Sequence, residues 1–125
     1  MASERILIVD DNAANLKLAR IVLSLAGYTV ETAVDAEQAQ AAMSTFSPQL
    51  ILMDLQLPGM DGLELTRRIK ADVATRDTIV LAVTAYAMRG DKERALLAGC
   101  DGYVTKPIDT RTLADTVAGY LGQSL

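Results

Sequence analysis

The chain contains no histidine, and this absence excludes several kinds of chemistry at once. Histidine is the usual general base near neutral pH and the commonest metal ligand. The chain therefore has no histidine base, no histidine-ligated metal and no phosphohistidine of its own to donate. Any chemistry that we assign to it has to rest on other side chains.

Cysteine is nearly absent as well, since Cys100 is the only one. One cysteine excludes an internal disulfide, and sparse cysteine is typical of proteins of a reducing compartment. We therefore expect a cytoplasmic protein. Cys100 itself lies in Ala-Gly-Cys-Asp-Gly, where we interpret it as a small, partly buried residue between a helix and a strand.

Long apolar runs and basic blocks are missing too. No uninterrupted apolar stretch approaches the length that a membrane span needs, and the start of the chain runs directly into a predicted strand, so we expect neither a membrane segment nor a signal peptide. The net charge is −4. The densest basic group, Arg67, Arg68 and Lys70, is flanked by Glu64 and Asp72, which favours a solvated helix face over a nucleic-acid contact.

The 125 residues, half of them hydrophobic, suit one domain over 1–125. Strand and helix patterns alternate five times along the chain. The predicted strands are 5–9, 28–33, 50–53, 78–84 and 102–105, and the predicted helices are 12–26, 35–46, 63–71, 91–98 and 109–121. Short connections favour an α/β fold with right-handed crossovers and a parallel sheet covered on both faces. Five strands suit the flavodoxin-like (βα)5 order 2-1-3-4-5, whose switch point lies between strands one and three.

Charged residues stand where predicted strands end. Asp10 and Asp11 follow the first strand, Asp54 follows the third, and Lys106 follows the fifth. Ligands of such folds lie beyond the carboxyl ends of the strands, so these side chains are expected to converge. Three adjacent carboxylates repel one another unless a cation lies among them. The pattern therefore indicates a magnesium site beside a lysine, which suits phosphoryl chemistry.

Each of these residues also has a purely structural interpretation. Asp11 can serve only as a helix cap, and Asp54 can begin a turn. The second acid, Asp10, is harder to explain by capping, because a cap needs one side chain. Lys106 and Thr84 gain significance only from their position beside the acids.

Four segments of the chain, taken together, resemble the receiver domain of two-component response regulators. They are Ile-Leu-Ile-Val-Asp-Asp-Asn at 6–12, Ile-Leu-Met-Asp-Leu-Gln-Leu-Pro-Gly-Met-Asp-Gly at 51–62, Val-Thr-Ala at 83–85 and Gly-Tyr-Val-Thr-Lys-Pro at 102–107. The resemblance extends over essentially the whole chain. It implies a signalling protein that accepts a phosphoryl group from the phosphohistidine of a histidine kinase or a histidine phosphotransfer protein, and then binds a downstream protein.

The resemblance implies a role for each residue. Asp54 would be the phosphoacceptor, and Asp10, Asp11, Asp54 and the backbone carbonyl of Gln56 would hold Mg²⁺. An ionised carboxylate can be the covalent nucleophile without a general base. The metal and a lysine would balance the charge of a loose phosphoryl-transfer transition state.

The same resemblance assigns the phosphoryl-binding and switching groups. Lys106, Thr84 and the amide of Ala85 would bind the phosphoryl oxygens, and a cis bond before Pro107 would aim Lys106 inward. Thr84 and Tyr103 would move on phosphorylation and remodel a partner-binding face, for which we expect Met88, Arg89, Lys92, Tyr103 and Arg111.

Finer features concern the subclass and lifetime. Asn12 and Asn15 resemble phosphorelay and hybrid-kinase receivers, and 83–94 resembles single-domain cell-division-control regulators. Gln56 and Tyr86 occupy positions that tune hydrolysis in the family, and bulky Tyr86 predicts slow autodephosphorylation. We expect a stand-alone regulator.

Three other functions remain to be weighed. A haloacid-dehalogenase-like phosphatase needs an acid where Gln56 stands. A flavodoxin-like electron carrier needs a phosphate-binding loop, and Asp10 and Asp11 would repel its FMN. A degenerate receiver that only binds proteins stays open, although every expected chemical group is present.

Overall fold

The computed structural model describes residues 4–55, 62–84 and 90–122. Within these residues, ten elements alternate in the predicted manner. They are β1 (Arg5–Val9), α1 (Ala13–Leu25), β2 (Thr29–Ala33), α2 (Ala36–Thr45), β3 (Leu50–Asp54), α3 (Gly62–Ala71), β4 (Ile79–Thr84), α4 (Asp91–Ala98), β5 (Gly102–Thr105) and α5 (Leu113–Tyr120).

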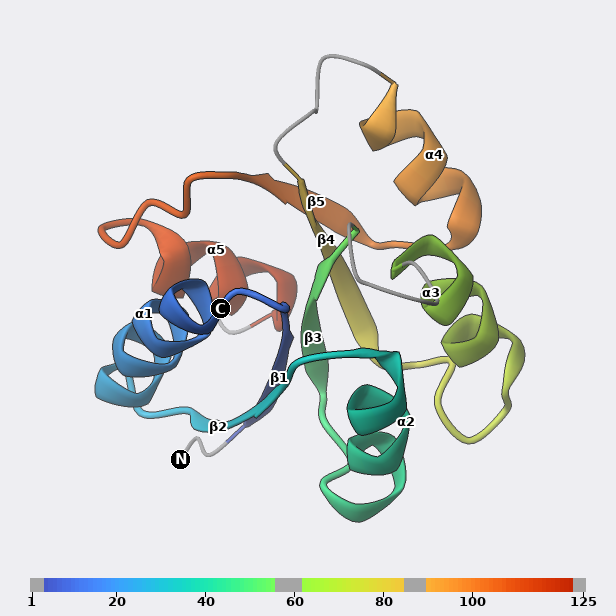
Figure 1. The fold of residues 1–125 in the computed structure, drawn as a ribbon, viewed down its shortest axis with the longest axis horizontal. Coiled ribbons are helices and arrows are strands. Elements are labelled where there is room, and N and C mark those ends of the chain that lie inside the picture. Colours follow the sequence, from blue (N-terminus) through green and yellow to red (C-terminus); the bar gives the residue numbers. More distant parts are fainter. Residues whose placement is uncertain (1–3, 56–61, 85–89, 123–125) are drawn as a thin grey trace.

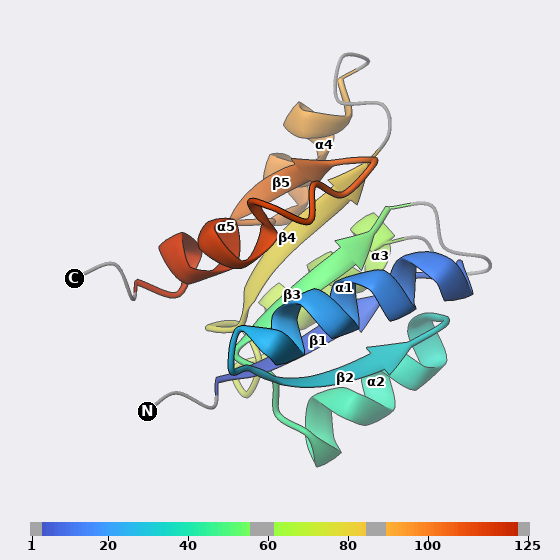
Figure 2. The ribbon, with the colours of Figure 1, turned by 90° about the vertical axis from the view of Figure 1, so that its left-hand side faces the viewer.

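The strands form one parallel sheet in the order β2-β1-β3-β4-β5, which confirms the predicted flavodoxin-like topology. The strand arrows all run toward one end of the molecule in Figure 2, so the carboxyl ends of the strands share one edge. Strand β1 lies between β2 and β3, with Val9 level with both Ala33 and Met53. The change of direction in strand order therefore falls between β1 and β3, where Asp10 and Asp54 stand.

Alternation along the strands builds two apolar layers. Ile6 and Ile8 of β1 belong to the layer under α1 and α5, whereas Leu7 and Val9 belong to the layer under α2, α3 and α4. Figure 1 shows these two groups of helices on opposite sides of the sheet. Since both faces are covered, the strands are nearly continuous apolar runs rather than alternating ones.

The helix boundaries follow local hydrogen bonds. Helix α2 begins after Asp35, whose carboxylate accepts a hydrogen bond from the backbone N–H of Gln38. Helix α5 begins at Leu113, so the prediction of a start at Asp109 is wrong. The Asp109 carboxylate accepts a hydrogen bond from the backbone N–H of Arg111 and holds 109–112 in a turn.

Two residues differ from their predicted surroundings. Cys100 lies between α4 and β5 as expected, but it is 5% exposed and its Sγ is 3.8 Å from Thr66 Oγ1. Lys70 does not belong to a solvated face: its Nζ donates hydrogen bonds to the carbonyls of Arg76 and Thr78 and pairs with Asp101. Among the described residues, no helix combines the length and the apolarity required to cross a bilayer.

Candidate functional site

The acidic residues of the site are positioned by the ends of two adjacent strands. Asp10 directly follows β1, and Asp54 is the last residue of β3. The backbone N–H of Asp10 donates a hydrogen bond to Ala33 on one side, and that of Leu55 donates to Val83 on the other. These bonds tie the turn after each strand to its neighbour, so the two carboxylates are fixed by the sheet itself.

The three predicted acids do come together. One carboxylate oxygen from each of Asp10, Asp11 and Asp54 lies within 4.8 Å of the others. Asp54 is 2% exposed and Asp10 is 3% exposed, while Asp11 lies at the surface. Carboxylate oxygens are the ligands that Mg²⁺ prefers, and the exposed side leaves room for the waters that this ion retains. The described donor set therefore fits a magnesium ion.

Lys106 supplies the positive charge beside the acids. Its Nζ lies 3.2 Å from Asp54 Oδ2 and 3.7 Å from Asp10 Oδ2. The backbone N–H of Lys106 donates a hydrogen bond to the Thr84 carbonyl at 2.8 Å, which ties the end of β5 to the end of β4. The Lys106–Pro107 peptide bond is cis.

Asp10 carries the electrostatic cost of this crowding. Burial raises the pKa of its carboxyl, and the charge of Asp54 raises it further, while the backbone N–H of Asn12 and the charge of Lys106 act in the opposite direction. The Asn12 N–H donates to Asp10 Oδ1 at 2.8 Å. The Asn15 amide reaches Asp10 Oδ2 at 3.5 Å. The carboxylate is thus held in place but short of compensating charge, which an added cation would provide.

Gly62 is a positioning residue that sequence reasoning missed. A Cβ at this position would collide with the Asp54 carbonyl oxygen and would lie 3.0 Å from the Leu55 Cα. Helix α3 can therefore begin directly against the end of β3 only because residue 62 lacks a side chain. The available sequence signal is the glycine directly before the predicted helix 63–71.

The remaining predicted residues are placed only in part. Thr84 ends β4 and is 1% exposed, and Tyr103 on β5 is half-buried against the apolar layer under α2, α3 and α4. Arg111 is exposed and pairs with Asp109. The predicted residues Gln56, Ala85, Tyr86, Met88 and Arg89, together with the side chain of Lys92, lie outside what the structure describes.

Comparisons with known proteins agree on one family. The sequence pattern of the response regulator receiver domain matches residues 6–118. The polar-differentiation response regulator DivK of Brucella ovis is 42% identical over 123 residues, which cover 98% of this chain and 99% of that protein.

Solved structures give the same result. The receiver domain of the sensor histidine kinase PA1611 from Pseudomonas aeruginosa, with a magnesium ion coordinated in its active-site cleft, is 35% identical with a TM-score of 0.88, over 97% of this chain and 99% of that one. The CheY-like receiver domain protein of Methanospirillum hungatei is 33% identical with a TM-score of 0.88, over 98% and 96% of the two chains.

Proposed function

The chain belongs to the family of response regulator receiver domains, and we propose that Asp54 is its phosphoacceptor in a two-component phosphorelay. Membership makes it a signalling protein of two-component systems. The assignment to Asp54 rests on one observation: its buried carboxylate lies among the acids of the candidate metal site and 3.2 Å from Lys106 Nζ.

The proposed reaction is a displacement at phosphorus. A carboxylate oxygen of Asp54 attacks the phosphoryl group of a partner's phosphohistidine, the P–N bond breaks, and the histidine leaves with the bonding electrons. Lys106 pairs with a phosphoryl oxygen as charge builds on the equatorial oxygens, and it orients the group on Asp54. The Thr84 hydroxyl and the Ala85 amide bind further phosphoryl oxygens in this proposal.

A magnesium ion would be held by Asp10, Asp11, Asp54 and the Gln56 carbonyl. When bound, it supplies positive charge that screens the acids from one another and from the incoming phosphoryl oxygens. The convergence of the three carboxylates supports this, as does the magnesium ion in the related receiver of PA1611.

The partners follow from the same chemistry. Because the chain has no histidine, the phosphohistidine of this proposal belongs to another protein, a histidine kinase or a histidine phosphotransfer protein. The output would be binding of a downstream protein after Thr84 and Tyr103 respond to the phosphoryl group. We propose a single receiver domain over 1–125, which the near-complete overlap with DivK supports. We also propose a cytoplasmic location, for which the single cysteine is the support.

We also propose that the phosphorylated form is long-lived. This rests on the bulk of Tyr86, which would hinder a water attacking the aspartyl phosphate. A Tyr86→Ala variant should lose its phosphoryl group faster than the wild type in a time course of intact mass. Equal rates would remove Tyr86 from the explanation.

Intact mass after incubation with acetyl phosphate tests the central assignment. The wild type should gain one phosphoryl group with Mg²⁺ and far less without it, and Asp54→Asn should gain none. Asp35→Asn, which alters a partly buried acid at the cap of α2, away from the carboxylate site, is the matched control and should behave as the wild type. A phosphoryl group on Asp54→Asn, or none on the wild type with Mg²⁺, would overturn the assignment.

A further inference from the structure

One motif of the sequence has no role in the proposed function. Asn12 and Asn15 stand three residues apart, directly after the paired acids Asp10 and Asp11. In the structure Asn12 is the N-cap of α1, and Asn15 lies half-buried in the first turn of that helix. The motif therefore lies beside the candidate metal site.

The two asparagines use different chemical groups. The side-chain oxygen of Asn12 accepts a hydrogen bond from the backbone N–H of Asn15 at 3.0 Å, so this side chain caps the helix. The backbone N–H of Asn12 donates to Asp10 Oδ1 at 2.8 Å. Asn15 contacts Asp10 through its side chain instead, whose Nδ2 donates to Oδ2 at 3.5 Å. Only this last bond depends on the type of residue, because every residue except proline has a backbone N–H.

The two bonds hold both oxygens of the Asp10 carboxylate. A carboxylate held through one oxygen can still turn about its Cβ–Cγ bond, because that torsion has a broad distribution. The second bond restricts this rotation. Lys106 Nζ also approaches Oδ2, but it is farther away, at 3.7 Å, and lies closer to Asp54. Since a carboxylate has about four acceptor positions, the two bonds leave room for a metal ion.

An oriented carboxylate favours metal binding. When hydrogen bonds already hold a ligand, the ion does not have to fix it on binding, and loss of such a partner lowers the metal affinity. Asp10 is almost completely buried, so water cannot readily replace a lost donor. The orientation of this carboxylate therefore depends on donors from the protein.

We propose that Asn15 is a positioning residue of the metal site, whose side-chain amide orients the Asp10 carboxylate for Mg²⁺. This inference rests on the magnesium site of the proposed function and assigns one further residue to it. Asn15 does not bind the ion itself, because it acts through Asp10. Its replacement should therefore lower the Mg²⁺ affinity only while the Asp10 carboxylate is present.

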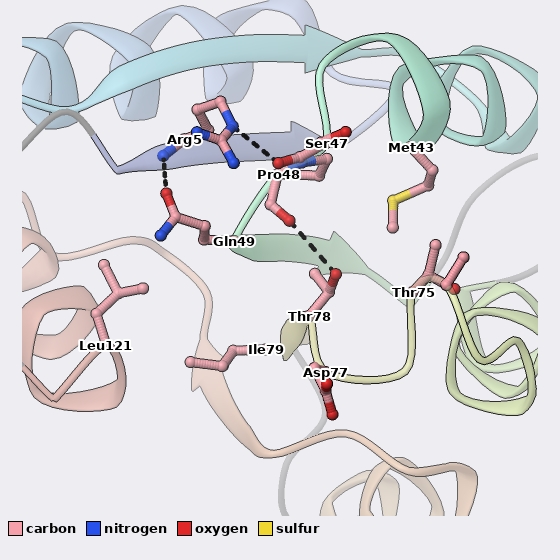
Figure 3. Close-up of a pocket in the computed structure, with 11 residues that line it drawn as sticks. Arg5, Met43, Ser47, Pro48, Gln49, Thr75, Asp77, Thr78, Ile79 and Leu121 are labelled. Carbon is pink, nitrogen blue, oxygen red and sulfur yellow. Dashed lines mark hydrogen bonds between the residues drawn. The ribbon is translucent and has the colours of Figure 1, made fainter.

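A second carboxamide, at the other end of β3, provides the comparison. Gln49 directly precedes the strand that Asp54 ends, and it lines a cavity of about 430 Å³ at the opposite edge of the sheet. Figure 3 shows its Oε1 accepting a hydrogen bond from the backbone N–H of Arg5, at 3.0 Å. This carboxamide bonds to a main-chain group rather than to a carboxylate, although its hydrogen bond is the shorter one. Gln49→Leu is therefore the matched control for Asn15→Leu.

Titration of the ¹⁵N-labelled protein with Mg²⁺, without a phosphoryl donor, tests the proposal. Saturable shifts at the amides of Asp10 and Leu55 give the dissociation constant. Asn15→Leu should raise this constant about tenfold, the lower end of the usual range, because the bond is long. Asn15→Gln keeps an amide donor and should raise it less, and Gln49→Leu should leave it unchanged. Leucine is a good helix former, so α1 should remain intact.

The same titration in an Asp10→Ala background separates positioning from a structural role. If Asn15 acts through Asp10, Asn15→Leu should lower the Mg²⁺ affinity no further once the carboxylate is gone. A general weakening of α1 would lower the affinity equally in both backgrounds, and that result would overturn the proposal. Equal dissociation constants for Asn15→Leu and the wild type, or for Asn15→Leu and Asn15→Gln, would overturn it too.

The wild-type titration distinguishes this proposal from the one on which it rests. If the wild type shows no saturable shift with Mg²⁺, the metal site and the role of Asn15 are both wrong. If the wild type and Asn15→Leu bind Mg²⁺ equally, only the role of Asn15 is wrong, and the metal site stands.

Discussion

Two lysines at opposite edges of the sheet have nearly the same exposure and very different surroundings. The Lys70 side chain is 20% exposed, and its Nζ lies 2.7 Å from the Thr78 carbonyl and 2.9 Å from Asp101 Oδ2. The Lys106 side chain is 22% exposed, and its Nζ is shared between Asp54 and Asp10.

The difference lies in how far each group of charges is balanced. Lys70 and Asp101 are one cation and one anion, and Asp101 also accepts a hydrogen bond from the backbone N–H of Val80 at 2.8 Å. At the other edge, two buried acids and the exposed Asp11 surround one lysine. The first arrangement is complete without a ligand and stabilises the fold. The second has excess negative charge, which the proposed metal ion would balance at the cost of some stability in the metal-free protein.

The largest expected effect comes from removing the lysine of the acidic edge. Lys106→Met should slow phosphorylation by acetyl phosphate by about 100-fold, because the group that neutralises the transferring oxygens is lost. The rate of mass gain with saturating Mg²⁺ measures it. Lys70→Met should be phosphorylated at nearly the wild-type rate. Equal losses in the two variants would remove the contrast between the edges.

Gly62 tests how closely the acidic edge depends on backbone packing. Gly62→Ala should destabilise the protein by about 3 kcal/mol, because the new methyl group meets the backbone of Asp54 and Leu55. Urea unfolding measures this. Gly119→Ala on α5 is the control: it has nothing within 4 Å and should stabilise by about 0.5 kcal/mol through helix propensity. If Gly62→Ala and Gly119→Ala both destabilise the protein, replacing any glycine with alanine is harmful, and contact with Asp54 is not the cause.

Lys70 tests the other edge of the sheet, where the strands begin. Lys70→Met should lower the free energy of unfolding by about 2 kcal/mol, because Asp101 and two carbonyls lose their charged donor. The matched control is Arg67→Met, whose pairing with Glu64 is exposed and should contribute under about 1 kcal/mol. If the two variants are equally stable, Lys70 is a surface lysine after all.

The contrast also shows how far sequence reasoning reaches. Strand order and the meeting of Asp10, Asp11 and Asp54 were predictable. An apolar run predicts a buried strand, and the acid that follows the run marks the carboxyl end of that strand. The role of Lys70 was not, since its partners Thr78 and Asp101 lie 8 and 31 residues away. Nothing local distinguishes Lys70 from Arg67 and Arg68. The start of α5 was missed because a side-chain bond of Asp109 competes with the helix.

The smallest expected effect concerns the uncompensated acid. Without metal, Asp10→Asn should raise the free energy of unfolding at neutral pH by about 1 kcal/mol, because a buried charge beside Asp54 is removed while the Asn12 N–H keeps an acceptor. Urea unfolding in the presence of a chelator measures it. With Mg²⁺ the order should reverse, since the wild type gains metal binding and the variant loses a ligand.

The pH dependence gives this last prediction its sign. The pKa of the Asp10 carboxyl is raised in the folded state from its ordinary value of 3.8, chiefly by burial. The folded protein therefore binds this proton more tightly than the unfolded chain, and Asp10 destabilises the fold progressively as the pH rises above 3.8 through the raised pKa. The advantage of Asp10→Asn should be absent at acidic pH and grow toward neutrality. If Asp10→Asn were equally more stable than the wild type at every pH, the gain would come from packing rather than from charge. The excess of negative charge around Lys106 would then not explain how the two edges of the sheet differ.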